Sequence, residues 1–258
     1  MHAPQTCDAV AEARELMAVD VHLVSPNSKP SMGPVQNSVL GVALLASETR
    51  LTRAQLSDLV EAMLPRGCTT LPRIPPPAAM ARRGGRWVGL WTGRQVLSLI
   101  VPASQTRRGD AFENELVVDR GELIAGELGK SVFGTGRGCL LHTIMLDETP
   151  ARARSVIDAL GRVACAYLCI RGFTMGMADC LGAIPLPPAP SLAGLDEHDA
   201  QLKLVTYRSQ IAANVDAAGA LLEGNALITM VRCGSKGNPV NAAQTMCCVG
   251  CAPPRRER

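Results

Sequence analysis

The residues best suited to bind an anion lie near the C-terminal end of the chain, in the stretch 233–244 with the sequence CGSKGNPVNAAQ. Two glycines bracket Ser235 and Lys236, so the backbone can adopt positive φ angles and turn its amide groups to one side. Asn238 is a favourable helix N-cap, and Pro239 suits the first helical position because no N–H is needed there. Unpaired amides, a helix N-terminus and the Lys236 ammonium together favour a phosphate-binding turn.

The alternative for this stretch is a glycine-rich turn that only begins a surface helix. An isolated G-x-x-G has low specificity, and the P-loop pattern G-x-x-x-x-G-K-[ST] does not occur in the chain. A second glycine-rich segment, 133–138 (FGTGRG), lacks the glycine spacing and the strand–helix frame of a dinucleotide-binding fingerprint. The turn around Lys236 is therefore the better candidate for a phosphate site.

The ten cysteines form neither a zinc pattern nor a disulfide pattern. Cys248 and Cys251 make one C-x-x-C, but no second pair and no nearby histidine complete four ligands. Most of the others are scattered through apolar or mixed sequence, which suits small buried thiols. The N-terminus does not resemble a signal peptide, and no apolar run reaches the roughly 18–20 residues of a membrane span. We expect a soluble protein of a reducing compartment.

The amino-acid composition indicates which residues build the core and which classes of partner the net charge disfavours. Of the 258 residues, 47% are apolar but only 3% are aromatic, so the core is built mostly from Ala, Val, Leu, Ile and Met. The net charge is +3, and the terminal residues 255–258 supply two of those charges. Bulk charge therefore does not predict non-specific nucleic-acid binding. The basic segment Arg82–Arg86 either touches a polyanion or is a solvated loop.

Hydrophobic periodicity and capping residues predict an α+β fold of mixed helices and short antiparallel strands. The expected helices cover 7–19, 52–64, 150–171, 197–223 and 239–249, and the strands lie between about 96 and 146. Residues 115–128 have the pattern of a hairpin that turns at Arg120-Gly121, whereas 96–102 fits a helix or a buried strand equally. The proline-rich stretch 24–37 excludes regular structure, so it is either an ordinary crossing loop or a loop held by a ligand or another chain.

Six blocks of the chain occur in the order found in one protein family. They are VSPNSKPSMGPVQNSVLG (24–41), LWTGRQVLSLIVP (90–102), GELIAGEL (121–128), GCLLHT (138–143), GFTMGMAD (172–179) and MVRCGSKGNPVNAAQ (230–244). Together they resemble the largest subunit of multi-subunit DNA-directed RNA polymerases of eukaryotic or large-DNA-virus type. The resemblance implies a tail of the active-site domain at 1–20, a pore domain at 21–182, a linker at 183–195 and a shortened funnel domain at 196–258 that ends before the bridge helix.

The resemblance also implies an activity, namely template-dependent transfer of nucleoside monophosphates to an RNA 3′ end. In the family this chemistry depends on Mg²⁺ held by a loop of aspartates, which precedes the part aligned with the start of this chain. We therefore assign no catalytic residue and no metal ligand here, and we expect the chain alone to be inactive. The implied partners are other polymerase subunits, especially the second-largest, together with template DNA, RNA and nucleoside triphosphates but no membrane. The implied location is the transcription machinery of the nucleus or of a virus.

The family's substrate-binding positions carry over to five residues. Lys236, with Ser235 beside it, stands where the family has a lysine near the entering triphosphate. Arg94 stands in the pore lining where the family usually has lysine, so the charge is kept and the shape changes. Asn241 and Gln244 match polar positions near the bridge helix, and Gln244 lies close to the amanitin site of eukaryotic relatives. Alternatively, both are polar residues of a helix face that neighbouring loops satisfy.

Two departures from the family leave a second function open. The part between Asp179 and Met230 is much shorter than in the family, and after Gly250 the prolines of 251–258 exclude a bridge helix. A non-catalytic remnant or an interaction module without polymerase activity is therefore the alternative to a working piece of the enzyme. An independent phosphate-binding protein is a further alternative, although no second catalytic group accompanies residues 233–244.

Overall fold

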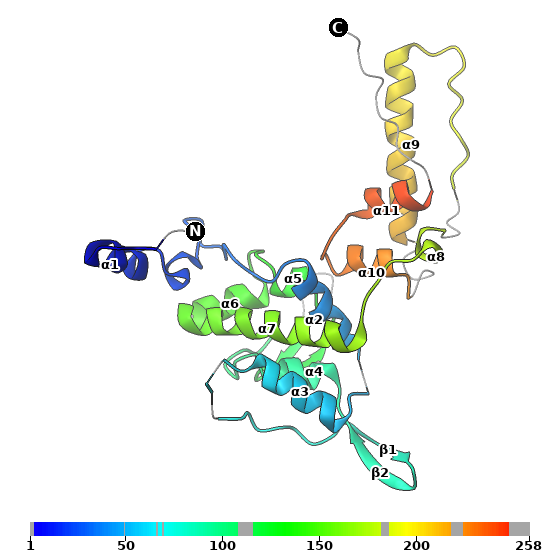
Figure 1. Cartoon of the computed structure of the whole chain (residues 1–258). Helices are drawn as coiled ribbons and strands as arrows, with labels where there is room; N and C mark the ends of the chain where they lie inside the picture. Colours follow the sequence, from blue (N-terminus) through cyan, green and yellow to red (C-terminus); the bar gives the residue numbers. More distant parts are fainter. Residues whose placement is uncertain are drawn as a thin grey trace. The chain divides into compact units, whose positions relative to one another are not determined.

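The computed structural model describes residues 3–48, 50–65, 67–68, 70–107, 116–181, 186–217 and 224–247. The chain divides into two compact units, Met1–Gly172 and Phe173–Arg258, and each is described by itself. The described residues form helices and two short antiparallel strand pairs (Figure 1), which confirms the α+β class. None of the described helices has the length and apolar character that a membrane crossing requires.

Three helices form the centre of the N-terminal unit. Helix α7 (Pro150–Arg171) packs against both α2 (Asn37–Ser47) and α3 (Arg53–Met63). The helices predicted at 52–64 and 150–171 are thus confirmed, as are the N-cap Thr52 and the end of α7 at Gly172, where φ is 73°. The predicted stripe of α3 is buried at Leu56, Leu59, Val60 and Met63.

Helix α2 was not among the predicted helices. Seven of its eleven residues are buried, so its sequence shows no alternation between an apolar and a polar face. Gly41 explains how this helix approaches α7 so closely. A Cβ added at Gly41 would lie 2.6 Å from the carbonyl oxygen of Ala164. A glycine at this position therefore lets the two backbones meet.

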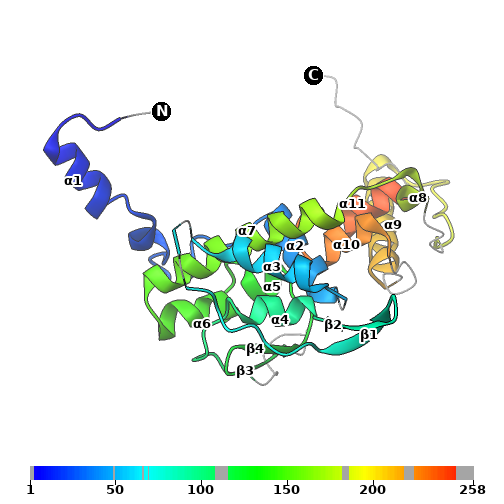
Figure 2. The same ribbon diagram turned by 60° about the horizontal axis from the view of Figure 1, so that its bottom comes forward.

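Three shorter helices complete the same unit, α4 (Gly93–Ser98), α5 (Lys130–Phe133) and α6 (Leu140–Asp147). Helix α4 packs on α2 and on the strand β4 (Glu122–Ala125), so it lies between the central helices and a hairpin (Figure 2). The ambiguous run 96–102 therefore begins inside a helix. Strands were expected as far as residue 146, and α6 corrects this expectation.

Cys139 caps helix α6 with its thiol. Its Sγ accepts a hydrogen bond from the amide of His142 at 3.4 Å and donates to the carbonyl of Gly134 at 3.1 Å. Burial raises the pKa of the Cys139 thiol above its usual range. The thiol is therefore held in its protonated form and serves as a structural group, as expected for a small buried cysteine. The same expectation is wrong for Cys7, Cys68, Cys165 and Cys169, which are exposed.

Two antiparallel hairpins supply the strands of the described residues. Strands β3 (Val117–Asp119) and β4 pair across Arg120-Gly121, where φ is 45° and 82°, as the sequence predicted. Strands β1 (Ala79–Arg83) and β2 (Arg86–Leu90) form a hairpin that was not predicted. The basic segment Arg82–Arg86 is thus the tip of a hairpin and not an irregular loop, because Gly84 and Gly85 both adopt the positive φ of a tight turn.

The N-terminal segment of the first unit is largely exposed. The helix predicted over 7–19 is observed as α1 (Cys7–Glu15), followed by the 3₁₀ turn η1 (Val19–His22). None of the residues of α1 is buried, and Leu16 and Met17 beyond it are 63% and 73% exposed. The proline-rich stretch is irregular from Ser25 to Gln36 apart from an isolated bridge at Pro30, which confirms that it forms neither helix nor sheet.

The C-terminal unit consists of four described helices, α8 (Met177–Cys180), α9 (Glu197–Ala217), α10 (Ala226–Arg232) and α11 (Pro239–Met246). Its core is a small apolar cluster of Ile211, Ala212, Val215, Leu227, Ile228, Ala242 and Ala243. The helices predicted at 197–223 and 239–249 are confirmed as far as residues 217 and 246, whereas residues 218–223 and 248–249 lie outside the described ones. The same holds for 183–185 of the predicted linker, and residues 186–196 have no helix or strand.

Asp179 ties this unit together at the start of α10. Its carboxylate accepts hydrogen bonds from the amides of Gly176 and Ala226, both at 2.8 Å, and its carbonyl accepts one from the side chain of Asn225. The bond from Gly176, followed by that from Ala226, lowers the pKa of Asp179 below its usual range. A carboxylate near the first turn of α10 also suits the positive end of the helix dipole.

Candidate functional site

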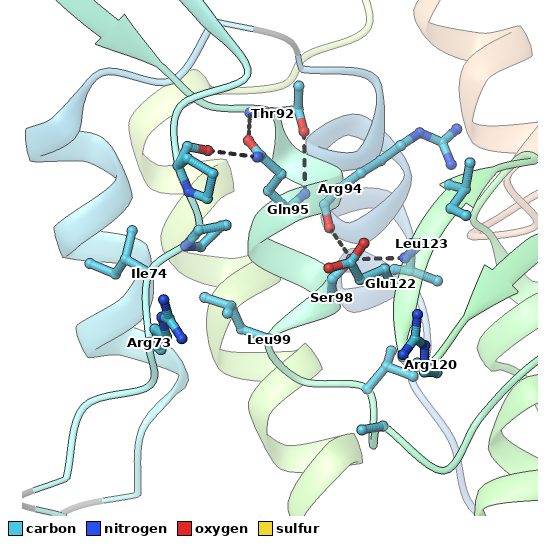
Figure 3. A pocket seen from close by; sticks show the side chains of 16 residues that line it. Arg73, Ile74, Thr92, Arg94, Gln95, Ser98, Leu99, Arg120, Glu122 and Leu123 are labelled. Atoms are coloured by element: carbon cyan, nitrogen blue, oxygen red, sulfur yellow. Dashed lines mark hydrogen bonds between the residues drawn. The ribbon is translucent and has the colours of Figure 1, made fainter.

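A groove of about 1160 Å³ opens beside α4 in the N-terminal unit (Figure 3). Its lining comes from the loop 73–76, from α4 and the residues after it, and from the turn and strand 120–124. Three of the lining residues are arginines, and one of them is Arg94, a predicted site residue. The groove therefore contains the part of the predicted site that falls in this unit.

The first wall of the groove is the loop 73–76, and residues at the start of helix α4 hold it in place. Thr92 and Gln95 form a capping box at the start of the helix, and the Nε2 group of Gln95 also donates to the carbonyl of Pro76 at 3.0 Å. The indole of Trp91 donates to the carbonyl of Pro75 at 2.9 Å. The loop 73–76 thus has the carbonyls of Pro75 and Pro76 bonded to side chains at the start of α4, and its position is fixed before any ligand binds.

The second wall is the turn and strand 120–124, which is fixed by the C-terminal end of α4. The hydroxyl of Ser98 accepts a hydrogen bond from the amide of Leu123 at 2.9 Å and donates to the carbonyl of Arg94 at 2.8 Å. Gly121 makes the adjacent turn possible, since its φ is 82° and an added Cβ would lie 2.8 Å from the carbonyl oxygen of Pro102. This turn places Arg120 on the wall of the groove.

Arg94 has a structural partner as well as a place in the groove. Its Nη2 group donates to the carbonyl of Gly126 at 2.5 Å, so the side chain joins α4 to the end of β4. Its Nη1 atom is buried and has no hydrogen-bond partner among the described residues. Burial lowers the pKa of the Arg94 guanidinium, which nevertheless stays charged at neutral pH. This nitrogen therefore lacks an acceptor, which a group outside the described residues would have to supply.

The sequence did not predict Arg73 and Arg120 as members of the site. Figure 3 shows them on opposite walls of the groove, with Leu99 between them. With Arg94 they set three cationic side chains against one carboxylate, that of Glu122. Only the tertiary packing of α4 between the loop and the hairpin brings these residues together. The positive φ of 45° at Arg120, which is unusual for a residue with a long side chain, is a feature of the structure and not of the sequence.

The glycine-rich turn near the C-terminus has the predicted backbone but not the predicted free amides. Gly234 and Gly237 have φ angles of 73° and 80°. However, the amides of Ser235 and Lys236 both donate to the carbonyl of Met230, at 3.1 and 3.5 Å. The prediction of unpaired amides is wrong for these two residues, because the turn closes the C-terminal end of α10.

Of the predicted site residues around this turn, some have side chains that hydrogen-bond within the unit and others have side chains that are exposed. The Ser235 hydroxyl is buried and donates to the carbonyl of Met230 at 3.2 Å. Asn241 is engaged in the capping box with Asn238, which confirms the predicted N-cap of α11. Lys236 is exposed, and Gln244 is partly buried two turns into α11. Lys236 is thus the charged group that the turn presents to solvent.

The predicted site residues therefore fall into both units. Ser235, Lys236, Asn241 and Gln244 belong to the C-terminal unit, and Arg94 belongs to the N-terminal one. Within residues 3–48, 50–65, 67–68, 70–107, 116–181, 186–217 and 224–247, no group of three or more His, Cys, Asp or Glu side chains is arranged to hold a metal ion. The described residues do not fit a Mg²⁺ site, so no step through a metal is derived for this chain.

Comparison with known proteins matches two successive parts of the chain to one family. The sequence profile of the family described as RNA polymerase Rpb1, domain 3, matches residues 22–180, and that of RNA polymerase Rpb1, domain 4, matches residues 195–252. The chain is similar to DNA-directed RNA polymerase III subunit RPC1 of Homo sapiens, with 26% identity over 299 residues that cover 97% of this chain and 21% of the relative.

Two further relatives show the same similarity. DNA-directed RNA polymerase III subunit rpc1 of Schizosaccharomyces pombe is 27% identical over 301 residues, which cover 97% of this chain and 21% of the relative. DNA-directed RNA polymerase II subunit RPB1-A of Trypanosoma brucei brucei is 34% identical over 187 residues, which cover 69% of this chain and 10% of the relative. The chain thus spans about a fifth of the length of the polymerase III relatives that it matches.

Proposed function

Since the chain belongs to the family of RNA polymerase largest subunits, we propose that it serves in a DNA-directed RNA polymerase, as part of the wall along which nucleotides reach the active site. The observation that carries this proposal is the succession of two family domains, 3 and 4, over residues 22–180 and 195–252. The partners that follow are the second-largest subunit and other polymerase subunits, template DNA, RNA and nucleoside triphosphates, in the transcription machinery. We assign residues 21–182 to the pore and residues 196–258 to a shortened funnel.

In this proposal the described residues attract and guide a triphosphate and take no part in bond making. The exposed ammonium of Lys236 is the group that meets the phosphates, on a turn whose geometry is fixed by Ser235 and the carbonyl of Met230. Arg94 contributes a positive charge to its groove, where Arg73 and Arg120 add to it. Asn241 and Gln244 act through α11, whose start is fixed by the Asn238–Asn241 capping box.

Nucleotidyl transfer itself requires groups that the described residues do not contain. Phosphoryl transfer in this family proceeds with metal-bound carboxylates, and no such group of acids is present among the described residues. We therefore expect the purified chain, supplied with Mg²⁺, template and nucleotides, to make no RNA. Measurable synthesis by the pure chain would show that a catalytic centre is present after all.

Isolation of the tagged chain from its native cells tests the membership in an assembled enzyme. The proposal predicts that the second-largest polymerase subunit is recovered with it and that the recovered complex incorporates nucleotides into RNA. Recovery of the chain without any polymerase subunit contradicts the proposal and favours the alternative, a remnant or an interaction module without polymerase activity.

A substitution at Lys236 tests the role of the turn. In the recovered complex, Lys236→Gln is expected to raise the KM for nucleoside triphosphates about tenfold, the value of one charge-assisted hydrogen bond, while Lys236→Arg keeps most of the affinity. Lys203→Gln, which removes an exposed lysine of α9 in the same unit, is the matched control and leaves KM unchanged. An equal effect of the Lys236 and Lys203 substitutions would remove the turn from the nucleotide path.

A further inference from the structure

The hairpin of β1 and β2 has two faces with different surroundings. The register pairs Arg82 with Trp87 and Arg83 with Arg86, and directly opposed residues of an antiparallel pair share a face. The face of Ala81 and Val88 is partly buried toward the base of the hairpin. The other face carries Met80, Arg82 and Trp87, which are all exposed. An arginine and an indole thus lie side by side on the solvent face.

The base of the hairpin is anchored while its tip extends from the unit. Leu90 is buried, and Trp91 pairs with Leu51 in an isolated bridge. An added Cβ at Gly89 would lie 3.0 Å from the side chain of Pro77, so the base is packed against the residue that follows the loop 73–76. Figure 1 shows β1 and β2 extending away from the helices of the N-terminal unit. The tip is therefore presented on a fixed support.

Positive charge is concentrated at this tip without compensation. Residues 79–90 contain three arginines and no acidic residue. Arg83 and Arg86 stand directly opposite each other, and like charges in this position destabilise a hairpin. None of Arg82, Arg83 and Arg86 forms an ion pair with a residue of the described part of the chain. An anion placed between the guanidinium groups of Arg83 and Arg86 would relieve their repulsion.

The two tryptophans of the chain differ sharply in exposure. Trp91 is 6% exposed, its indole donates to Pro75, and the guanidinium of Arg53 lies 5.6 Å from its ring centroid. Trp87 is 68% exposed. An isolated large aromatic ring on a charged hairpin adds nothing to the core, but it offers a flat surface on which another ring can stack.

We propose that the β1–β2 hairpin binds single-stranded nucleic acid, with a base stacked on Trp87 and the adjoining phosphate held by Arg82 on the same face, while Arg83 and Arg86 on the opposite face of the tip add local positive charge. Stacking requires the face of a base, which is accessible in a single strand and covered in a duplex. The alternation of base and phosphate along a strand matches the Trp87 indole and the Arg82 guanidinium, which stand opposite each other on one face of this hairpin. The arrangement attracts phosphate through local charge, although the net charge of the chain is only +3. An acidic protein surface would use the arginines and leave the indole without a partner of its own.

This inference does not rest on the proposed role of Lys236 or of the polymerase assembly. The hairpin and its support lie within the N-terminal unit, and the ligand is a polynucleotide in place of a free nucleotide. Its test can therefore be made on the purified full chain. A negative result at Lys236 would leave the hairpin proposal standing, and the reverse is also true.

Tryptophan fluorescence provides a direct test. Titration of the full chain with short oligo(U), oligo(dT) and the corresponding duplex is expected to quench the emission of Trp87 with the single strands and not with the duplex. The comparison of oligo(U) with oligo(dT) shows whether the sugar matters. The logarithm of the binding constant should fall linearly with the logarithm of the salt concentration, with a slope of about −0.7 for each phosphate contacted.

Substitutions separate stacking from simple attraction of charge. Trp87→Ala, followed by fluorescence anisotropy of a labelled oligonucleotide, should weaken binding about fivefold or more, and Trp87→Phe should restore most of it. Arg82→Gln should reduce the magnitude of the salt slope by about 0.7, whereas Arg152→Gln, at an exposed arginine of α7, should not change it. Circular dichroism checks that each variant keeps the helices of the wild-type chain.

Three results would overturn the proposal. One is the absence of quenching by any single strand at low salt. The second is binding that Trp87→Ala leaves unchanged, because the arginines alone would then account for it. The third is tighter binding of poly-glutamate than of oligo(U) or oligo(dT), which would assign the hairpin to an acidic protein surface.

Discussion

Tyr167 connects two helices of the N-terminal unit through one polar contact. Its ring is 2% exposed, and its hydroxyl donates to a carboxylate oxygen of Glu48, just after α2, at 3.2 Å. Burial, and then the nearby charge of Glu48, raise the pKa of Tyr167 to about 12. The folded state therefore binds the phenolic proton more tightly than the unfolded chain, whose tyrosines ionise near pH 10.

The sign of this shift predicts how stability changes in alkali. A group whose pKa is raised by folding contributes its stabilisation below the unfolded pKa and loses it as the pH rises through the folded pKa. The free energy of unfolding of the wild-type chain should thus exceed that of Tyr167→Phe by about 1 kcal/mol at neutral pH. The difference should shrink between pH 10 and pH 12. Urea unfolding of both proteins across this range measures it, and a constant difference would contradict the role of Tyr167.

Single residues also show how far the sequence reaches. The N-caps Thr52 and Asn238 were predicted because a cap is read from its neighbours along the chain. The hydrogen bonds from the amides of Ser235 and Lys236 to the carbonyl of Met230 depend on how α10 ends in three dimensions. The spacing of the glycines in the sequence does not predict these bonds. The contact of Arg94 with Gly126 joins residues 32 apart, so periodicity could not reveal it.

At the scale of elements, two glycines of one helix pair predict opposite effects of the same substitution. A Cβ at Gly41 would lie 2.6 Å from the carbonyl oxygen of Ala164, whereas at Gly161, within α7, the nearest atom is the hydroxyl of Ser38 at 3.8 Å. Gly41→Ala should therefore lower the free energy of unfolding by about 1–3 kcal/mol or more. Gly161→Ala should raise it by about 0.5–1 kcal/mol through helix propensity.

Denaturant unfolding of the two variants beside the wild type measures both effects, and each variant controls for the other. A loss of stability in both would mean that space at position 161 is tighter than the contacts with Ser38 indicate. A gain in both would mean that α2 and α7 separate at little cost. Only opposite signs agree with the close approach of the two helices at Gly41.

The elements that were predicted share a readable boundary or face. Helices α3 and α7 have a cap and an apolar stripe, and the Arg120-Gly121 turn marks the β3–β4 hairpin. Helix α2 was missed because nearly all its faces are buried, and β1–β2 because its strands carry arginines in place of an alternating apolar pattern. The groove beside α4 was missed for another reason, since its lining comes from three separate parts of the chain.

The whole chain combines two separate cores with an uncovered apolar segment. The C-terminal core of Ile211 and its neighbours lies entirely within its own unit, and the N-terminal core is built around α7. By contrast, Leu16, Met17, Val19 and Val21 are each at least 46% exposed. Apolar side chains grouped in this way make a chain associate with itself or with a partner.

A double substitution separates this surface from the folded core. Leu16→Lys combined with Met17→Gln should change the free energy of unfolding by less than about 0.5 kcal/mol, because neither side chain is buried. The same variant should reduce self-association in sedimentation experiments. Leu23→Ala, at a neighbouring leucine that is 0% exposed, is the contrasting variant and should cost about 2–5 kcal/mol. Comparable losses of stability in the two proteins would show that the N-terminal segment packs more tightly than its exposure indicates.

The buried thiol of Cys139 at the start of α6 makes local opening of the N-terminal core measurable by chemical labelling. Cys7, Cys68, Cys165 and Cys169 are exposed and meet an alkylating reagent directly, while Cys139 is enclosed and keeps its proton. Labelling at Cys139 therefore waits until α6 comes away from the loop at Gly134. The difference in labelling rate between the exposed thiols and Cys139, followed by mass spectrometry, reports how often this part of the N-terminal core opens.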